Sequence, residues 1–320
     1  MGGRPVAYVD RFCFALGSQK WSVEESVEAG RTRTGAAELR DAGFRYHHVC
    51  DAGETAYDLA RAAVATLDPS LLQAVDAIVY ATCIPVNGSV GDVSRFDRTG
   101  DVKALMDFPA SRLQADLGLD RAIVIGLNQQ ACTSMLGSMR LARALLASED
   151  GMQQILCLSS DRFPPGARYE QAYSLISDGA AACIVSRDTA AYRLVAAHQI
   201  TNGAMVGADD DETVGAYFSY THRLVAELLA MAGKTASDLD WVVPQNTNVK
   251  AWQIMARLLG IDHGRVFHPS SADVGHVISG DNIVNMVHLD ATGDVRPGDL
   301  VLLVMAGYGM NWQGVLLEKT

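Results

Sequence analysis

Along most of the chain, segments whose apolar residues recur with the helical period alternate with short apolar runs typical of strands. Apolar residues recur with the helical period in residues 54–67 and 213–233, and each of these segments is followed by an apolar run typical of a buried strand, at 76–83 and 238–245. Strands that alternate with helices in this way are typical of layered α/β proteins. The pattern therefore predicts an α/β fold along the whole length.

The same order of elements occurs twice, which indicates an internal duplication. Residues 117–132 (LGLDRAIVIGLNQQAC) can be laid on residues 259–276 (LGIDHGRVFHPSSADVGH), with two extra residues in the second copy. This alignment sets Cys132 opposite His276. Duplicated units normally pack about a pseudo-twofold axis, so equivalent positions meet near it. The alternative is chance similarity between two ordinary βα units.

One stretch has no counterpart in the second half. Residues 84–109 are polar, charged and rich in glycine, which indicates a long excursion between a strand and a helix. Excursions of this length are usually functional or mobile. No low-complexity linker divides the chain, so we expect two halves that fold together. Residues 1–187 form the half that carries Cys132, and residues 188–320 form the half that carries His276 and Asp281.

Composition and charge exclude several classes of protein. No run reaches the roughly 18 uncharged apolar residues that a membrane span needs, and the amino terminus lacks the apolar core of a secretory signal. We therefore expect a cytoplasmic protein without a membrane partner. The net charge of -11, with no basic tract, argues against nucleic acid as a partner. The six cysteines show no CxxC spacing, so neither a disulfide framework nor a metal site is expected.

Cys132 is a candidate nucleophile because of its place in the pattern. The stretch NQQACTSMLGSMRLARALL puts it at the start of an amphipathic helix. Unpaired backbone N–H groups and the helix dipole at such a start stabilise a thiolate, which is the form that attacks. The alternative is a structural cysteine that fills a tight packing site.

His276 and Asp281 are candidates for the proton acceptor that a nucleophile needs. A separation of five residues does not suit one helical face. Across the turn at Ser279 and Gly280, however, a carboxylate can fold back onto the imidazole and fix its tautomer. The alternatives are a helix N-cap for Asp281 and an ordinary loop histidine for His276. Only the duplication distinguishes His276 from the other histidines.

A third candidate element is the stretch MAGYGMNWQG. Gly307 and Gly309 flank Tyr308 and permit backbone conformations that aim an N–H group outward, as an oxyanion site for a thioester requires. This signal is weak by itself, because Gly-x-Gly turns between strands are common.

In their order and spacing these stretches resemble the thiolase-fold condensing enzymes, specifically the β-ketoacyl-acyl-carrier-protein synthase III family. The matching stretches are GFRYHHVCDAGETAYDLA, DFPASRLQADLGL, QQACTS, SDGAAACIV, VVPQNTNVKAW, VGHVISGDN and PGDLVLLVMAGYGMNWQGVLLEK. The resemblance implies a thiolase-like, five-layered αβαβα fold and a homodimer. It also implies an acyl-cysteine intermediate formed from acyl-CoA or an acyl carrier protein, with no permanently bound cofactor.

The chain departs from that family at two positions. Condensing members carry a histidine where this chain has Gln245 and an asparagine where it has His276. The pair that would stabilise an enolate during decarboxylation of a malonyl thioester is therefore missing. Cys132, His276 and Asp281 instead resemble the arrangement of a non-condensing acyltransferase offshoot. That resemblance suggests polyketide or antibiotic biosynthesis.

The resemblance also implies which residues contact the substrate. The backbone N–H groups of Cys132 and Tyr308 would form the oxyanion hole, although a glycine is usual at position 308. Lys250 matches a position where the family places a basic residue for the carrier protein or the coenzyme phosphates; an exposed lysine is the alternative. The other expected substrate-binding residues are Gln245, Asn246, Asn248, Gly307 and Gly309. A polar strand end is the alternative for the first three.

We therefore expect an acyltransferase that loads Cys132 from a thioester and transfers the acyl group to a hydroxyl, amine or thiol of a small-molecule acceptor without decarboxylation. One alternative is a condensing enzyme in which Gln245 acts as a hydrogen-bond donor. Another is a catalytically inactive protein that binds a carrier protein. Release of carbon dioxide distinguishes the two enzymes, and an acyl adduct on Cys132 distinguishes both from the inactive partner.

Overall fold

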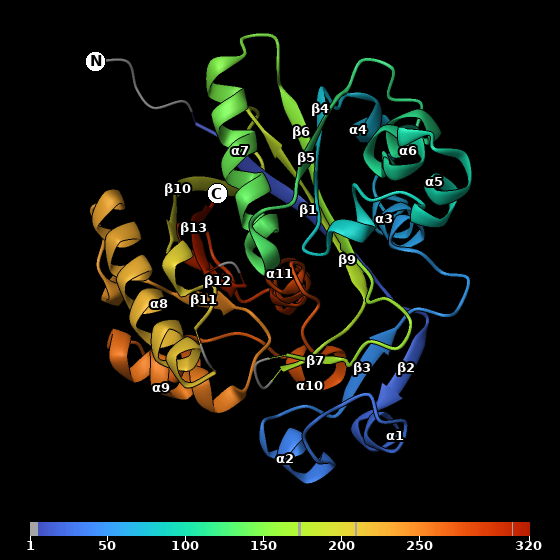
Figure 1. The fold of residues 1–320 in the computed structure, drawn as a ribbon. Coiled ribbons are helices and arrows are strands. Elements are labelled where there is room, and N and C mark those ends of the chain that lie inside the picture. The colour runs from blue at the N-terminus through green and yellow to red at the C-terminus, as the bar shows by residue number, and fades with distance from the viewer. Residues whose placement is uncertain (1–5, 172–173, 209, 309) are drawn as a thin grey trace.

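The computed structural model describes residues 6–171, 174–208, 210–308 and 310–320. Within them a mixed sheet of nine strands crosses the protein (Figure 1). Its strands, in the order in which they hydrogen-bond, are β11 (Trp241–Pro244), β12 (Leu300–Gly307), β13 (Asn311–Lys319), β10 (Tyr192–Thr201), β1 (Tyr8–Leu16), β9 (Gly179–Ser186), β6 (Gln154–Asp161), β4 (Ala77–Ala81) and β5 (Ile123–Leu127). Two smaller sheets pair β2 (Gln19–Ser22) with β3 (Tyr46–Val49), and β7 (Glu170–Gln171) with β8 (Ser174–Leu175).

The order of the large sheet is nearly symmetric about the contact between β1 and β10. On one side, antiparallel β9 is followed by the parallel strands β6, β4 and β5. On the other side, antiparallel β13 is followed by β12 and its parallel neighbour β11. Val266 forms an isolated β-bridge with Val242 of β11, at the position where the fifth strand of this half would lie. This is the arrangement expected of two copies of one α/β unit.

Helices complete the layers. Two of them, α7 (Ser134–Ser148) and α11 (Asp281–Thr292), lie between the two halves of the sheet (Figure 1). The outer face of one half is covered by α3 (Ala56–Val64) and α6 (Pro109–Asp116), and that of the other by α8 (Asp210–Ala232) and α9 (Val249–Leu259). The remaining α-helices are α1 (Val23–Glu28), α2 (Ala36–Asp41), α4 (Pro69–Gln73), α5 (Val93–Thr99) and α10 (Ser271–Val274). The result is the expected αβαβα layering.

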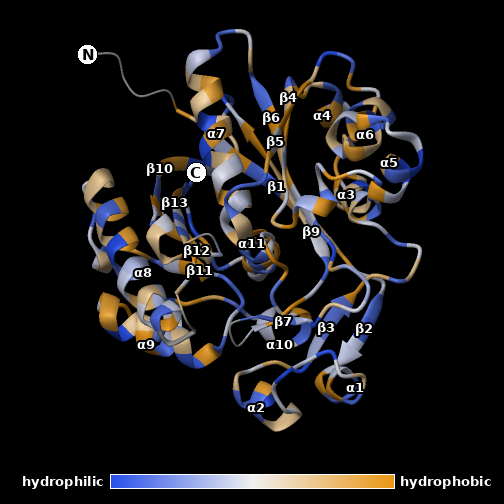
Figure 2. Ribbon diagram, in the orientation of Figure 1, coloured by the Kyte–Doolittle hydropathy of each residue, from blue (hydrophilic) through white to orange (hydrophobic). Residues whose placement is uncertain are grey.

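Hydrophobic burial fixes α7 at the centre of the molecule. Figure 2 shows the sheet strands as largely hydrophobic, with mixed faces on the helices that cover them. On α7 the side chains of Met135, Met139, Ala142 and Leu146 recur with helical spacing and are at most 2% exposed. Full burial of each larger side chain contributes about 1.5–3 kcal/mol. The turn that precedes α7 is therefore anchored on a rigid element.

The excursion at residues 84–109 lies between β4 and α6, as expected, but it is not irregular. It forms α5 and two 3-10 turns, η1 (Pro85–Asn87) and η2 (Val102–Leu105). Asp92 caps α5 by accepting a hydrogen bond from the Arg95 N–H at 2.9 Å, and Gly100, with φ of 64°, ends it. No helix among the described residues has the length and apolar character needed to cross a membrane.

Candidate active site

Cys132 lies in a tight turn that leads directly into α7. The turn is the 3-10 segment η3 (Ala131–Thr133), and Ala131 has φ of 45°, in the left-handed region that residues with a side chain rarely adopt. Gly307 packs against this turn so closely that a Cβ atom there would lie 2.9 Å from the Cys132 nitrogen. The backbone of the turn is therefore closely packed, and Cys132 is 5% exposed.

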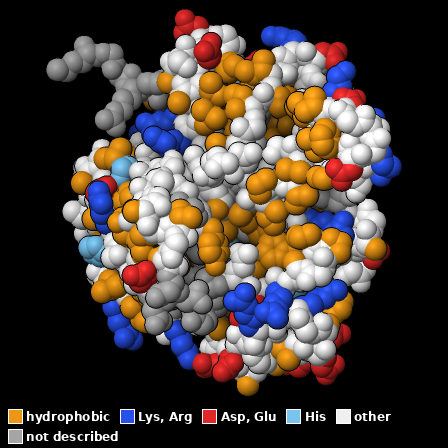
Figure 3. Space-filling model, viewed as in Figure 1, with side chains coloured by type: hydrophobic (Ala, Val, Ile, Leu, Met, Phe, Trp, Pro, Cys, Tyr) orange, Lys and Arg blue, Asp and Glu red, His pale blue; other side chains and the backbone are white. Residues whose placement is uncertain are grey.

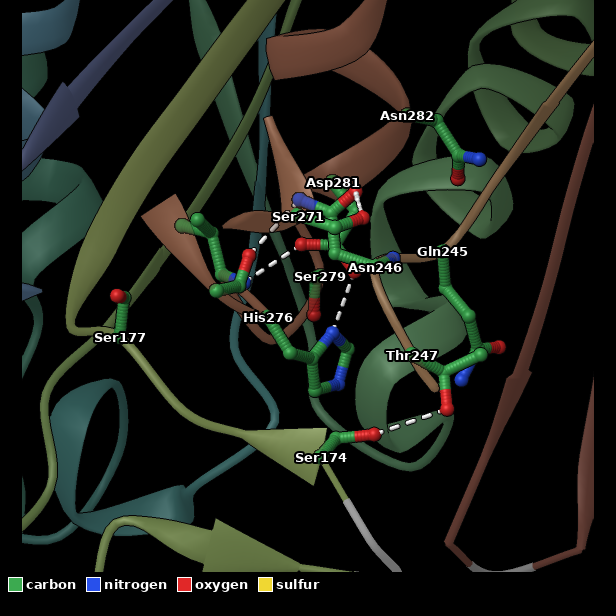
Figure 4. Close-up of polar contacts among 12 residues, drawn as sticks. Ser174, Ser177, Gln245, Asn246, Thr247, Ser271, His276, Ser279, Asp281 and Asn282 are labelled. Atoms are coloured by element: carbon green, nitrogen blue, oxygen red, sulfur yellow. Dashed lines mark hydrogen bonds and ion pairs between the residues drawn. The ribbon is translucent and has the colours of Figure 1, made fainter. Parts of the chain in front are cut away.

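His276 and Asp281 form a buried pair in the loop before α11 (Figure 4). His276 Nδ1 donates to Asp281 Oδ2 at 2.5 Å. Asp281 also accepts hydrogen bonds from the backbone N–H groups of Val277, at 2.6 Å, and Asn246, at 2.7 Å. The N-cap of α11 is Gly280, so Asp281 orients the imidazole and is not the cap. Because Nδ1 is occupied, His276 presents Nε2 to a partner.

The structure brings Cys132 and His276 together from opposite halves of the chain. Ser134 Oγ lies 2.8 Å from Ser279 Oγ, and Ser279 Oγ donates to the Ala131 carbonyl at 3.2 Å. These bonds join the turn of the thiol to the turn of the imidazole. The Cys132 and His276 side chains line one cavity, and each shifts the pKa of the other. The two positions that the internal alignment equates thus meet.

The surroundings of the pair favour a thiolate and an imidazolium. A hydrogen bond from Cys83 and the contact with His276 outweigh burial and lower the pKa of the Cys132 thiol to about 5. Burial disfavours a charged imidazole, but the Asp281 carboxylate and the hydrogen bonds to Asp281 and Cys132 together raise the pKa of His276 to about 10. At neutral pH these shifts favour a thiolate at Cys132 beside an imidazolium at His276, and a thiolate is the reactive form of a cysteine.

We expect the alkylation of Cys132 by iodoacetamide to be nearly independent of pH at neutral values and to slow as the pH falls through about 5, because the thiolate is then protonated. Peptide mass spectrometry measures the rate at each cysteine. Cys13, whose pKa burial raises to about 11, is the internal comparison, and its rate should climb with pH. A Cys132 rate that climbs tenfold per pH unit near neutrality would contradict the ion pair.

A cavity of about 470 Å³ leads from this pair to the surface. Cys132 and His276 are buried in its wall, whereas Ile254 and Tyr308 are about half exposed. Much of the remaining wall is apolar or aromatic and comprises Val214, Tyr217, Phe218, Ala251, Ala306, Met310 and Trp312. Such a wall suits an acyl chain or the arm of a thioester donor.

Several of the predicted substrate-binding residues line this cavity, namely Gln245, Asn248, Lys250, Gly307 and Tyr308. Gln245 Oε1 accepts from the Ala306 N–H at 2.6 Å, which fixes the side chain. Asn248 caps α9 by accepting from the Lys250 N–H at 2.9 Å, and the Lys250 ammonium pairs with Asp41. Gly309 lies outside the described residues. The oxyanion hole at Cys132 and Tyr308 stays a prediction.

Asn246 does not take the place that the sequence suggested. It is fully buried and is not part of the cavity wall. Its Nδ2 donates to Ser270 Oγ and to the Gly275 carbonyl, both at 2.8 Å, and its Oδ1 accepts from Ser271 Oγ at 3.0 Å. Its side-chain amide thus makes hydrogen bonds to neighbouring protein groups, and its backbone N–H donates to Asp281. The structure thus places the Asn246 side chain outside the cavity wall, and its backbone N–H helps to position the Asp281 carboxylate.

Sequence reasoning missed Cys83 and the aromatic wall formed by Tyr217, Phe218 and Trp312. Cys83 lies just past the carboxyl end of β4, and its thiol and that of Cys132 shift each other's pKa. One signal in the sequence could have indicated Cys83. Parallel strands end at the same edge of a sheet, so the residues that follow neighbouring strands lie close together there. Among the described residues, no group of three or more His, Cys, Asp or Glu side chains is placed to hold a metal ion.

Comparison with known proteins identifies the family. The family model described as 3-oxoacyl-[acyl-carrier-protein (ACP)] synthase III matches residues 128–203, and the one for its C terminal region matches residues 229–319. The beta-ketoacyl-[acyl-carrier-protein] synthase III of Dinoroseobacter shibae is 29% identical, and the alignment covers 92% of this chain and 91% of that protein. The synthase of Erythrobacter litoralis is 26% identical, with 86% and 88% covered.

Solved structures confirm the thiolase-like fold. FabH from Pseudomonas aeruginosa PAO1 superposes with a TM-score of 0.78 at 23% identity, covering 98% of each chain. ChlB3, described as an acyltransferase, has a TM-score of 0.81 at 19% identity, also covering 98% of each chain. Identities this low show the fold alone. The two family models, which together match more than half of the chain, and the curated relatives show that the chain belongs to the 3-oxoacyl-[acyl-carrier-protein] synthase III family of transferases.

Proposed function

We propose that the protein is an acyltransferase that forms an acyl-Cys132 intermediate and passes the acyl group to a small-molecule hydroxyl, amine or thiol without decarboxylation. One observation carries this proposal: an imidazole oriented by Asp281 lies against the Cys132 sulfur, at the position where the resemblance places an asparagine in condensing members. A thiol, a base and a carboxylate that orients the base are the parts that acyl transfer requires.

In the first half-reaction the Cys132 thiolate attacks the carbonyl carbon of the donor thioester. A new carbon–sulfur bond forms, and the carbonyl oxygen gains the negative charge that the backbone N–H groups of Cys132 and Tyr308 would stabilise. When the bond to the donor sulfur breaks, His276 gives its Nε2 proton to the departing thiol. The products are the acyl-enzyme, a free CoA or carrier-protein thiol, and a neutral His276.

In the second half-reaction His276 acts as the base. The negative charge of Cys132 is gone, and Asp281 holds the remaining proton on Nδ1, so Nε2 is free to accept a proton from the acceptor. The acceptor oxygen, nitrogen or sulfur bonds to the acyl carbon while the bond to the Cys132 sulfur breaks. The thiolate and the imidazolium are restored, and no carbon dioxide is formed.

Condensation is the second candidate, because the curated relatives are named as synthases. Gln245 also favours it, since the bond from the Ala306 N–H to Oε1 leaves its Nε2 as a donor. His276, however, is engaged by Asp281 and Cys132 and is not a free second donor. The two residues therefore do not reproduce the donor pair that would stabilise an enolate.

The test is a panel of acyl-CoA and acyl-carrier-protein thioesters, with intact-mass detection of loading and with carbon dioxide measured from a carboxyl-labelled malonyl thioester. We expect an adduct on the wild-type protein and on a Cys157→Ala control, whose thiol is buried on β6 away from the site, but not on Cys132→Ala. Release of carbon dioxide with chain extension would show condensation. The absence of an adduct from every thioester would show an inactive partner.

The donor and the biological role belong to the same proposal. Lys250 lines the cavity and pairs with Asp41, and it would exchange this carboxylate for a carrier protein or for the phosphates of coenzyme A. Such an exchange is inexpensive, because the exposed pair contributes little. The departures at Gln245 and His276 from a condensing enzyme support a role in polyketide or antibiotic biosynthesis in the cytoplasm.

We also propose a homodimer. Strand β5 is the edge of the large sheet, and Ile123 on it is exposed. The neighbouring excursion exposes Val86, Val90, Met106 and Phe108. Figure 3 shows hydrophobic side chains gathered on this side of the molecule. An apolar edge strand is normally covered, and a second copy that extends the sheet would cover it.

A further inference from the structure

A buried amide lies behind the turn that carries Cys132. Gln313 is part of β13 and is only 1% exposed. Its neighbour Trp312 stacks on Tyr220 of α8, so Gln313 points to the opposite face of the strand, towards α7. Burial of an amide costs free energy unless its polar atoms are hydrogen-bonded. The groups that Gln313 contacts therefore indicate what this residue does.

The Gln313 amide binds both ends of the turn. Its Nε2 donates to Gln130 Oε1 at 2.6 Å, to Thr133 Oγ1 at 2.9 Å and to the Thr133 carbonyl at 3.2 Å. A carbonyl oxygen only accepts, so the amide atom that faces it is the nitrogen. The Thr133 N–H and Oγ1 in turn donate to the Gln130 carbonyl at 3.0 and 2.7 Å. Gln130, Thr133 and Gln313 thus form a closed hydrogen-bonded unit, which we call the clamp.

Gly137 in the first turns of α7 leaves the space that the clamp occupies. A Cβ atom at this position would lie 1.8 Å from Gln130 Oε1 and 3.0 Å from Gln313 Nε2. Glycine within a helix is less stable than alanine. The helix therefore carries its less stable residue at the one turn where the Gln130 side chain packs against it.

We propose that the clamp positions the Cys132 sulfur towards His276, with Gln313 as the residue that joins the turn to the sheet. None of the three clamp residues is among the described residues that line the cavity, so they act through the turn and not on the substrate. Gln313 is therefore a positioning residue. The inference rests on the proposed function, in which Cys132 is the nucleophile.

The turn needs support of this kind because of its backbone. Ala131, between Gln130 and Cys132, has φ of 45°, and such a conformation persists only where the surrounding contacts enforce it. Gly307 packs against the Cys132 nitrogen, and the clamp fixes the residues before and after this pair. A reacting group that is displaced by about 1 Å can react roughly a hundredfold more slowly. Loss of the clamp should therefore affect the reactivity of the sulfur more than the fold.

The test uses the pH profile of Cys132 alkylation by iodoacetamide, followed by peptide mass spectrometry, because the clamp residues carry no charge. The side chains that act on the charge of the thiol are Cys83 and His276, which favour the thiolate, and Asp281, which opposes it. A shift of the pH at which alkylation is half maximal, after a change in an uncharged residue, reports that the sulfur has moved relative to these groups.

Gln313→Met keeps the length of the side chain and removes the donor. We expect its alkylation midpoint to rise by about one pH unit, because the thiolate loses part of its contact with the imidazolium. The matched control is Gln154→Met, which also removes a side-chain amide donor, in this case to the Leu71 carbonyl at 2.7 Å. Gln154 begins β6, at the end of the parallel strands opposite to the segment that leads to Cys132. Its midpoint should stay at the wild-type value even if both variants unfold at a lower temperature.

A second measurement separates positioning from binding. With any thioester that loads Cys132, Gln313→Met should lower kcat by about tenfold or more and leave KM nearly unchanged. A wild-type alkylation midpoint in Gln313→Met would overturn the proposal, as would an equal shift in Gln154→Met. A higher KM at an unchanged kcat would also overturn it.

A second pair of variants serves if Gln313→Met does not fold. Thr133→Val removes the hydroxyl at nearly constant shape, whereas Thr133→Ser retains it, so the midpoint should rise in the valine variant and stay at the wild-type value in the serine variant. Equal midpoints in the two would overturn the proposal. Alkylation needs no acyl donor or acceptor. A failure of every thioester to load would therefore refute the proposed function, while the midpoints would still decide whether the clamp positions the sulfur.

Discussion

Replacing Cys132 with alanine is expected to abolish the acyl-enzyme and to lower kcat/KM for acyl transfer by about a thousandfold or more. The thiolate is the only group on the reaction path that forms a bond to the acyl carbon, and its activation is specific. Cys83, His276 and the anchored turn at Ala131 all act on this one sulfur. Without it the remaining groups can only hold the donor near an acceptor.

Cys132→Ser is the informative companion to this variant. A serine hydroxyl has nearly the same size but no comparable anion at neutral pH, so we expect slow formation of an acyl-serine that intact mass spectrometry can detect. Steady-state transfer rates of both variants are compared with those of Cys157→Ala, which should transfer normally. Transfer by Cys132→Ala within about tenfold of the wild-type rate would indicate direct attack of the acceptor on the donor and would contradict the covalent route.

The sequence predicted which side chains lie close together where chain order and spacing carry the information. The repeated βα pattern placed Cys132 opposite His276 because equivalent positions of a duplicated unit meet at its axis, and they do lie in contact. The spacing from His276 to Asp281 predicted a carboxylate that folds back on the ring, and Asp281 lies there. Each of these inferences needed only the order of the elements, which hydrophobic periodicity reports directly.

What the sequence could not supply depends on contacts between distant segments. Asn246 follows a strand, as a cavity residue would, yet its amide is hydrogen-bonded to the Ser270 and Ser271 hydroxyls and to the Gly275 carbonyl. Cys83 follows an apolar run, and its nearness to the segment that carries Cys132 becomes visible only once β4 and β5 are known to be adjacent. Helix α5 was missed because seven residues are too few to show a period, although Asp92 and Gly100 mark its ends.

Asp281→Asn is expected to lower kcat for transfer by about a thousandfold or more, while the protein keeps its fold. Asp281 accepts hydrogen bonds from His276 Nδ1 and from two backbone N–H groups. An amide has one acceptor oxygen, so its NH₂ group must face one of these donors. Where it faces the ring, Nδ1 becomes the acceptor and Nε2 carries the proton, which is the tautomer that cannot act as a base towards the acceptor.

A merely structural role would give a different result, and the pH behaviour of His276 separates the two. The Asp281 carboxylate is the main influence that raises the pKa of His276 towards about 10, so the pKa of that imidazole should fall in Asp281→Asn as measured by NMR titration of the ring. The matched control is Asp273→Asn on α10, whose exposed carboxylate pairs with Arg45 at 3.1 Å outside the site. It should leave both kcat and the titration of His276 unchanged. Loss of activity with an unshifted His276 titration would show that Asp281 supports the loop and does not tune the base. A mismatched backbone donor costs about 1–3 kcal/mol, so thermal unfolding of both variants belongs beside the kinetics.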